Sequence, residues 1–385
     1  MKNDGNPVVF SYKKSPFPHT FPMKRLGIIL RRALCATFCI PVIFACHCSD
    51  RRPNDTIAEA ALKTVKKTDV VEHVFTHCLI AHPEISFQEG NSYGKHLDRD
   101  CLTPSEFRAI LEELYQNGYA LVNATDTFTI KDGVAYRAEF SFPADKKPLI
   151  FSFDDVVYAT KNKGKGMSDG LKVTNGEIVA YTQTHGEHRE EFVCILEDFI
   201  KKHPDFSYQG ARGILFLTGF DGILGYRTQK GSKNRQKEIE RALPVVQKLR
   251  ELGWLFGCHS YAHAHMKALT AEKMRSDCQK WKDEVASIVG ETVLYAYPYG
   301  EWVFGADGND ERQTALNEAG FKVFYGVGEN AFYTKMPLTE SSSRILFQDR
   351  CALDGVSLRR NNILRFFNAS KIYDNRRPIP FSATE

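Results

Sequence analysis

Short apolar segments alternate with segments of helical periodicity along most of this chain. Apolar runs of strand length occur at 147–153, 213–220, 254–257, 292–297 and 321–326. This alternation favours parallel strands joined by helices, because two parallel neighbours need a long crossover connection. We therefore predict an α/β fold, either a (β/α) barrel or a doubly wound sheet. In both folds, functional side chains gather at the carboxyl ends of the strands.

The clearest helix signal lies early in the series. Thr103 suits the N-cap, Pro104 suits the first helical position, and Glu106 completes a capping box. The segments on either side, 70–80 and 119–122, are predicted to be strands. Further helices are predicted over 192–200, 235–252, 270–289 and 310–319.

Charge and cysteine usage exclude several classes of protein. The net charge of +4 over 385 residues is small, and no dense run of Lys and Arg is present, so a nucleic-acid partner is not expected. Six cysteines outside the N-terminal region show no C-x-x-C pairing, which argues against a zinc ribbon or a thioredoxin-like motif. We expect most of these six to be free and buried. They are Cys78, Cys101, Cys194, Cys258, Cys278 and Cys351.

The N-terminal region has the pattern of an export signal. Four basic residues between 24 and 32 precede an apolar run from Ala33 to Ala45, which is short for a membrane span. The sequence Val42–Cys46 resembles a bacterial lipoprotein cleavage site, so Cys46 is a candidate for lipidation. Plain secretion, an uncleaved anchor and a buried helix remain alternatives. We predict an exported protein at the cell surface or outside the cell, with membrane contact only through this segment.

The chain is predicted to divide into four parts. Residues 1–48 form the export signal or a membrane or lipid anchor, 49–68 a polar linker, 69–370 one large folded domain, and 371–385 a C-terminal tail. Within the domain, the Gly- and Lys-rich stretch 161–187 is predicted to be an insertion on the rim, with a hairpin signature at Asn175-Gly176.

Two carboxylates follow the strand 147–153 directly. Asp154 and Asp155 could divide the work of a metal-assisted hydrolase, since one carboxylate holds the ion and another takes a proton from the attacking water. A helix N-cap or a turn is the alternative for such a pair.

A histidine cluster follows the strand 254–257. His259 and His263 are spaced so that one turn or a tight loop presents both to one ion, and His265 is the alternative second ligand. After the strand 292–297, the turn at Pro298-Tyr299-Gly300 could present a backbone N–H as an oxyanion donor. Together the three segments supply an Asp-His-His ligand set, a spare Asp and an oxyanion donor, which is a coherent site for acyl hydrolysis.

These segments resemble the first three motifs of the carbohydrate esterase family 4 polysaccharide deacetylases, over roughly 69–367. The resemblance implies a distorted, incomplete (β/α)7 barrel and a divalent ion, with Zn²⁺ as the default and Co²⁺, Ni²⁺ or Mn²⁺ also fitting. It also implies site roles: Asp154 as base, Asp155, His259 and His263 as metal ligands, and the Tyr299 N–H as oxyanion donor.

The sequence departs from the family pattern twice. Ala296 stands where members usually have the arginine that orients the base. No histidine follows His265, whereas many members take their general acid from a late histidine. The branch that de-N-acetylates poly-β-1,6-N-acetylglucosamine is similar in having permuted strands and an N-terminal acid histidine. By this resemblance His77 becomes the candidate acid, ahead of His73 and His82, with a buried structural histidine as the alternative.

The resulting prediction is a metal-dependent hydrolase that removes N-acetyl groups from an N-acetylglucosamine-containing surface polysaccharide, its acetylated substrate. An O-acetyl esterase of xylan-like glycans would use the same machinery with less need of an acid. A catalytically inactive carbohydrate-binding protein is the third reading, motivated by the missing arginine and the missing late histidine.

Overall fold

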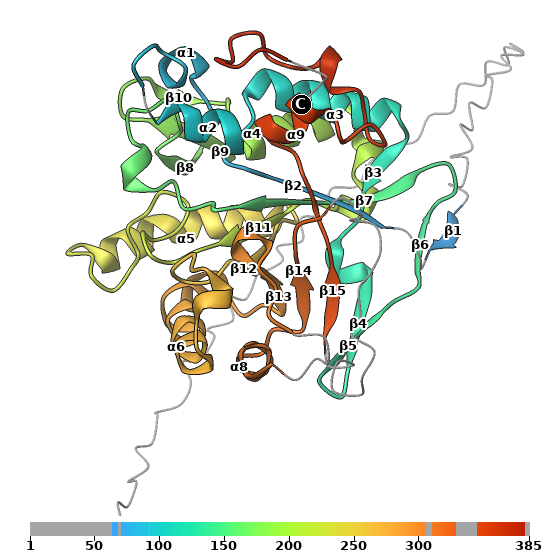
Figure 1. Ribbon diagram of the computed structural model, residues 1–385, viewed down its shortest axis with the longest axis vertical. Helices are drawn as coiled ribbons and strands as arrows, with labels where there is room; N and C mark the ends of the chain where they lie inside the picture. The colour runs from blue at the N-terminus through green and yellow to red at the C-terminus, as the bar shows by residue number, and fades with distance from the viewer. Residues whose placement is uncertain (1–63, 68–70, 92, 305–309, 329–344, 382–385) are drawn as a thin grey trace, which may run out of the picture. The chain divides into compact units, whose positions relative to one another are not determined.

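The computed structural model describes the chain from the end of the predicted linker onward (Figure 1). The predicted export signal, Cys46 and most of the predicted linker lie outside the described residues. In the part of the chain that is described, no helix has both the length and the apolar character needed to cross a bilayer. The described ranges are 64–67, 71–91, 93–304, 310–328 and 345–381.

A parallel sheet organises the domain. Its strands lie in the order β15-β14-β13-β12-β11-β7-β2-β16, with every neighbouring pair parallel, and β3 (Tyr119–Leu121) also pairs with β7. The strands of the main path are β2 (Glu72–His77), β7 (Lys147–Asp154), β11 (Ile214–Leu217), β12 (Leu255–Cys258), β13 (Leu294–Ala296), β14 (Val323–Tyr325), β15 (Leu346–Gln348) and β16 (Cys351–Ala352).

The two ends of this sheet meet. β15 and β16 stand at opposite ends of the strand order, yet only Asp349 and Arg350 separate them along the chain. The segment 346–352 therefore pairs with β14 at its start and with β2 at its end, which curls the sheet into a barrel. The prediction of a distorted, incomplete (β/α)7 barrel is confirmed.

Helices cover the outside of the sheet at the predicted places (Figure 1). The predicted helix 270–289 differs in one respect, because its regular part ends at Trp281 and a π-helical turn over Lys282–Ala286 precedes the last turn. The helices are α1 (Pro83–Ser86), α2 (Gly94–Asp100), α3 (Pro104–Gln116), α4 (Phe192–Lys202), α5 (Arg235–Glu251), α6 (Ala271–Trp281), α7 (Ser287–Val289), α8 (Glu311–Glu318) and α9 (Gly355–Arg360).

The segment predicted as a rim insertion contains most of a small antiparallel sheet. β8 (Gly170–Thr174), β9 (Glu177–Thr182) and β10 (Gly186–His188) pair in sequence order. Asn175 and Gly176 join β8 to β9 with φ of 52° and 79°, the left-handed values that a two-residue hairpin turn requires, so the hairpin is confirmed. Two further antiparallel pairs are β1 (Thr64–Lys67) with β6 (Phe140–Pro143), and β4 (Phe128–Lys131) with β5 (Val134–Arg137).

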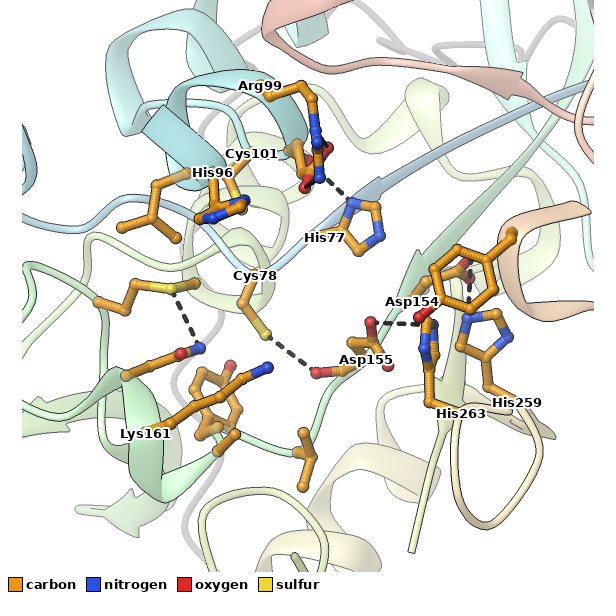
Figure 2. A pocket seen from close by; sticks show the side chains of 18 of the residues that line it. His77, Cys78, His96, Arg99, Cys101, Asp154, Asp155, Lys161, His259 and His263 are labelled. Atoms are coloured by element: carbon orange, nitrogen blue, oxygen red, sulfur yellow. Dashed lines mark hydrogen bonds and ion pairs between the residues drawn. The ribbon is translucent and has the colours of Figure 1, made fainter. Parts of the chain in front are cut away.

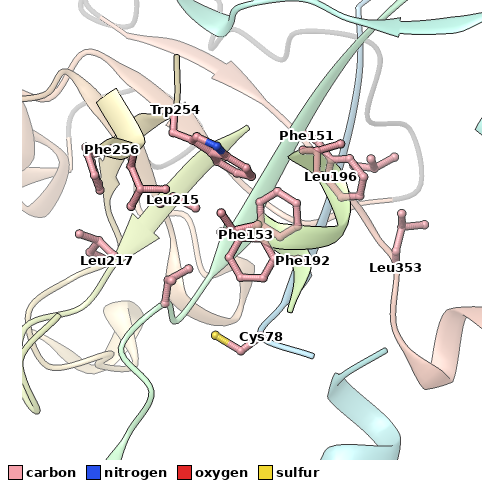
Figure 3. Close-up of a cluster of buried hydrophobic side chains, with 14 of the residues drawn as sticks. Cys78, Phe151, Phe153, Phe192, Leu196, Leu215, Leu217, Trp254, Phe256 and Leu353 are labelled. Carbon is pink, nitrogen blue, oxygen red and sulfur yellow. The ribbon is translucent and has the colours of Figure 1, made fainter. Parts of the chain in front are cut away.

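The period of strand β7 sends alternate side chains to opposite faces. Phe151 and Phe153 lie on the outer face, where Phe153 stacks on Phe192 of α4 at 3.9 Å between ring centroids (Figure 3). Ser152 and Asp154 lie on the inner face, where both contact Arg350. The buried aromatic layer thereby fixes which carboxylate of the Asp pair enters the barrel. All six cysteines outside the N-terminal region are buried, and Cys78, Cys101, Cys194, Cys258 and Cys278 are free thiols, which confirms the prediction that most of the six are free and buried.

Candidate active site

A cavity of about 640 Å³ opens at the carboxyl ends of the strands (Figure 2). It brings together all six residues predicted for the site, from segments that lie far apart in the sequence. They are His77, Asp154, Asp155, His259, His263 and Tyr299.

Three of these residues form a cluster suited to a metal ion. One ligand atom from each of Asp155, His259 and His263 lies within 4.8 Å of the others, and His263 Nε2 is 3.4 Å from Asp155 Oδ2. The second oxygen of Asp155 is buried without a hydrogen-bond partner among the described residues. A buried carboxylate oxygen without a donor is costly, and an ion would satisfy it. The donor set and this oxygen therefore fit a divalent cation.

Left-handed backbone at the strand ends explains how the polypeptide converges here. Asp155, Ser260, His263 and Tyr299 have φ between 50° and 57°. Such a conformation costs a non-glycine residue about 1 kcal/mol or more, and it persists where the surroundings enforce it. At Asp155 it turns the chain out of β7, so that two consecutive carboxylates reach one cavity.

Backbone and helix contacts hold the loop 259–265, which carries the three clustered histidines. The Nδ1–H of His259 donates to the Ala296 carbonyl at 2.8 Å, which leaves Nε2 free to bind an ion. The carboxylate of Asp277, on α6, accepts the backbone N–H groups of Tyr261 and Ala262. Burial lowers the pKa of His263, which favours the neutral imidazole that a metal ion requires. Asp277 was not predicted as part of the site, because it lies 16 residues after Tyr261 and no sequence motif connects the two.

Arg350 supplies the arginine beside the predicted base that is missing at Ala296. Its Nη1 and Nη2 lie 2.7 and 2.9 Å from the two oxygens of Asp154, and the guanidinium is fully buried. Ala296 therefore does not leave the predicted base without an arginine, because the arginine comes from the segment between β15 and β16. Its side chain crosses the barrel interior between the rings of Phe75 and Phe216.

Arg350 decides the charge state of Asp154. Burial by itself would raise the pKa of this carboxyl, but the adjacent guanidinium and His259 outweigh it and hold the pKa well below its usual value. Asp154 is thus an ionised carboxylate in a fixed orientation, 3.7 Å from His259 Nε2.

His77 lines the same cavity at the end of a neighbouring strand. It ends β2 directly beside Asp154 of β7, and its Nδ1–H donates to the Asp100 carbonyl at 2.9 Å. Figure 2 shows the other ring nitrogen on the side that faces the Asp and His residues. The two other early histidines have different roles. His73 is buried against Ser152, and His82 stacks on His185.

Tyr299 lies beside the ligand cluster. Its ring meets His263 edge-on at 4.6 Å and stacks on His265 at 4.1 Å. His265 is exposed and pairs with Glu301 at 3.0 Å, so the structure places His263, and not His265, with Asp155 and His259.

The chain is distantly similar to several solved structures. A Streptococcus pyogenes deacetylase, PplD, in complex with acetate has 12% identity and a TM-score of 0.43, over 78% of this chain and 99% of that chain. The putative polysaccharide deacetylase BA0330 from Bacillus anthracis has 14% identity and a TM-score of 0.43, over 79% of this chain and 69% of that chain. IcaB from Ammonifex degensii has 14% identity and a TM-score of 0.39, over 75% of this chain and 94% of that chain. No curated protein matches the sequence.

A family model supplies the stronger finding. Residues 232–324 match the family described as polysaccharide deacetylase. The matched segment runs from the start of α5 to β14 and contains His259, His263 and Tyr299, whereas His77, the Asp pair and Arg350 lie outside it. The segment with the histidine and Tyr299 motifs is thus similar to polysaccharide deacetylases, which supports a hydrolase that acts on amide bonds.

Proposed function

We propose that this protein is an exported, metal-dependent deacetylase that hydrolyses N-acetyl groups of an N-acetylglucosamine-containing polysaccharide. The observation that carries the proposal is the arrangement within one cavity. The ligand cluster, the Arg350-bound Asp154 and His77 all line it, and His77 is the register neighbour of Asp154 on the adjacent strand.

Asp155, His259 and His263 would hold the ion through one carboxylate oxygen and two imidazole nitrogens. When bound, the ion polarises the acetyl carbonyl and lowers the pKa of an attacking water. Three protein ligands leave further positions for water and substrate, as a catalytic zinc site requires.

Asp154 is the base in this mechanism. Its carboxylate is buried and ionised, and the two hydrogen bonds from Arg350 fix its plane beside His259. A base held in this way takes a proton from water without first having to reorient. Arg350 orients Asp154 and does not itself touch the substrate.

His77 and the Tyr299 backbone complete the reaction. An amine is a poor leaving group unless it is protonated as the C–N bond breaks, and the unbonded nitrogen of His77 is the donor for that proton. The Tyr299 N–H stabilises the negative charge that develops on the carbonyl oxygen.

The rival functions each make a different demand on this site. An O-acetyl esterase needs less help from an acid, and the position of His77 beside Asp154 therefore favours an amide substrate. The inactive reading was motivated partly by the missing arginine, which Arg350 replaces. The relation to the permuted poly-β-1,6-N-acetylglucosamine branch, export and lipidation at Cys46 remain parts of this proposal that rest on the sequence.

Acetate release from a panel of acetylated glycans tests the proposal. The panel contains poly-β-1,6-N-acetylglucosamine, N-acetylated chitooligosaccharides and acetylxylan, and bound metal is measured for each variant. The wild type should release acetate from an amide substrate, and Asp154→Asn should abolish turnover with metal retained. Release from acetylxylan alone would support the esterase, and polymer binding without release, even with added metal, would support the inactive reading.

The role of His77 has its own variant. His77→Asn should lower amide turnover by about 100-fold or more while the metal content stays unchanged. Normal turnover in this variant would remove His77 from the mechanism and leave the metal site intact.

A further inference from the structure

We propose that Arg377, from the C-terminal segment, is a positioning residue that holds His77 in its catalytic orientation. This inference rests on the proposed function, because it assigns a partner to the general acid of that same site. The connection runs through the end of helix α2, whose backbone contacts Arg377 on one side and His77 on the other.

The guanidinium of Arg377 is fully buried, and each of its five N–H groups has an acceptor. Nε and Nη2 donate to the two oxygens of Glu106 at 2.7 and 2.6 Å. Nη1 donates to a carboxylate oxygen of Asp98 at 3.0 Å. The two remaining N–H groups go to backbone carbonyls, those of Asp98 at 2.7 Å and Cys101 at 2.8 Å.

These two carbonyls flank the one that His77 uses. The last carbonyls of a helix have no partner within the helix, so something outside must satisfy them. At the end of α2, Arg377 takes the carbonyls of Asp98 and Cys101, and His77 takes that of Asp100. The position of the Asp100 oxygen is therefore set by the Arg377 guanidinium, which donates to backbone carbonyls before and after it.

Other contacts restrain both Arg377 and the end of α2. Glu106 belongs to the capping box of α3, where its carboxylate also accepts the Thr103 N–H, so Arg377 is anchored to the start of a helix. Gly355 of α9 packs so closely that an added Cβ would lie 1.8 Å from the Asp98 carbonyl oxygen. The end of α2 is thus clamped between α9 and the C-terminal segment.

Lysine could not reproduce this arrangement. An ammonium group has three donors around one point, whereas Arg377 reaches two carboxylates and two carbonyls through a rigid plane. A lysine would keep the charge opposite Asp98 and Glu106 and release at least one carbonyl. His77 would then lose its fixed acceptor, and its free nitrogen would no longer be aimed at the leaving amine.

The test compares two substrates that differ in their need for an acid. Turnover is measured with an N-acetylated chitooligosaccharide or poly-β-1,6-N-acetylglucosamine, and with 4-nitrophenyl acetate, whose nitrophenolate leaves without a proton. Arg377→Lys should lower kcat on the amide by about 100-fold, since small misplacements of a catalytic group cost about that much. KM, metal content and ester turnover should stay within about threefold.

Two matched variants and one double variant complete the experiment. Arg359→Met removes another buried arginine that pairs with Asp98, but that arginine donates to the side chain only, so His77 should be unaffected. Arg376→Ala removes the exposed neighbour in the same segment. The double variant Arg377→Lys/His77→Asn should be no slower on the amide than His77→Asn alone, because Arg377 acts through His77.

Several results would overturn the inference. Equal loss on amide and ester, or multiplied losses in the double variant, would show that Arg377 supports the fold alone. If Arg377→Lys does not fold, ¹⁵N NMR of the histidine side chains in the unchanged protein still decides. Neutral His77 should carry its proton on Nδ1, and an Nε2–H form would contradict the geometry. A wild type that releases no acetate from any glycan would instead refute the proposed function.

Discussion

Arg350 shows what a single residue can contribute to a site whose other members are visible in the sequence. The predicted residues follow strands, and each carries a local motif, whereas Arg350 lies 196 positions from Asp154 without any motif. Its neighbours in the sequence give no hint of the ion pair, because a bidentate contact across a barrel depends on the closure of the sheet. The substitution at Ala296 was visible, but its compensation was not.

Exchange of Arg350 for lysine should separate charge from geometry. Arg350→Lys keeps a cation beside Asp154 and loses the planar fork, so we expect kcat for acetate release to fall by about 100-fold with metal retained. Arg360→Lys, an exposed change on α9, serves as the control. Turnover within threefold of the wild type would show that Asp154 does not need a fixed plane.

A second residue-scale prediction concerns Glu191, a buried carboxyl that accepts the N–H groups of Leu79 and Phe192 and the Ser168 hydroxyl. Burial raises its pKa from 4.5 to about 7. The folded state therefore binds a proton more tightly than the unfolded state, and this contribution to stability is present below pH 4.5 and lost as pH rises to 7. Glu191→Gln should remove this dependence.

The measurement for Glu191 is the free energy of unfolding by urea between pH 4 and 8. Relative to Glu191→Gln, the wild type should lose roughly 3 kcal/mol across the window from 4.5 to 7 and nothing further above it. A constant difference between the two proteins at all pH values would contradict the raised pKa.

At the scale of elements, local signals predicted most of what the structure shows. The capping box at Thr103 and Glu106 is present as predicted, because it depends only on residues three apart. The end of the regular helix at Trp281 was missed, since a π-helical turn leaves the apolar periodicity almost unchanged. The packing of Arg377 was likewise hidden, because its partners lie on helices hundreds of residues earlier.

The cap of α3 should matter more than an exposed cap. Thr103 is fully buried and accepts the Glu106 N–H, whereas Thr270 caps α6 at the surface. Thr103→Ala leaves that N–H buried without its acceptor, so we expect a loss of about 2 kcal/mol, against about 1 kcal/mol or less for Thr270→Ala. Urea unfolding of both variants measures the difference, and equal losses would show that burial of the cap is irrelevant.

At the scale of the whole molecule, the sheet brings residues as far apart in the sequence as Phe75 and Val327 into one cavity. The sequence predicted that functional residues would meet at the carboxyl ends of strands, and the parallel register confirms the fold that makes this possible. It could not predict where the barrel closes, because β15 and β16 are too short to give a periodic signal.

Metal binding should stabilise the whole domain, since the ligands come from different strands. The metal is first removed with EDTA. Addition of Zn²⁺ at about 100 times its Kd should then raise the free energy of unfolding by about 2.7 kcal/mol, or Tm by several degrees. His263→Ala should abolish the shift, whereas His265→Ala should keep it, because His265 lies outside the ligand cluster. Loss of the shift in both variants would place the ion elsewhere.

The closing segment has a consequence for the order in which the protein becomes an enzyme. A ribosome completes the ligand cluster at His263 long before it reaches Arg350. A nascent or C-terminally cut chain would thus carry the proposed metal ligands while Asp154, the proposed base, lacks its contact with Arg350. Under the proposed function, the chain would become competent for hydrolysis only after β16 pairs with β2, and an unfinished copy would be inactive.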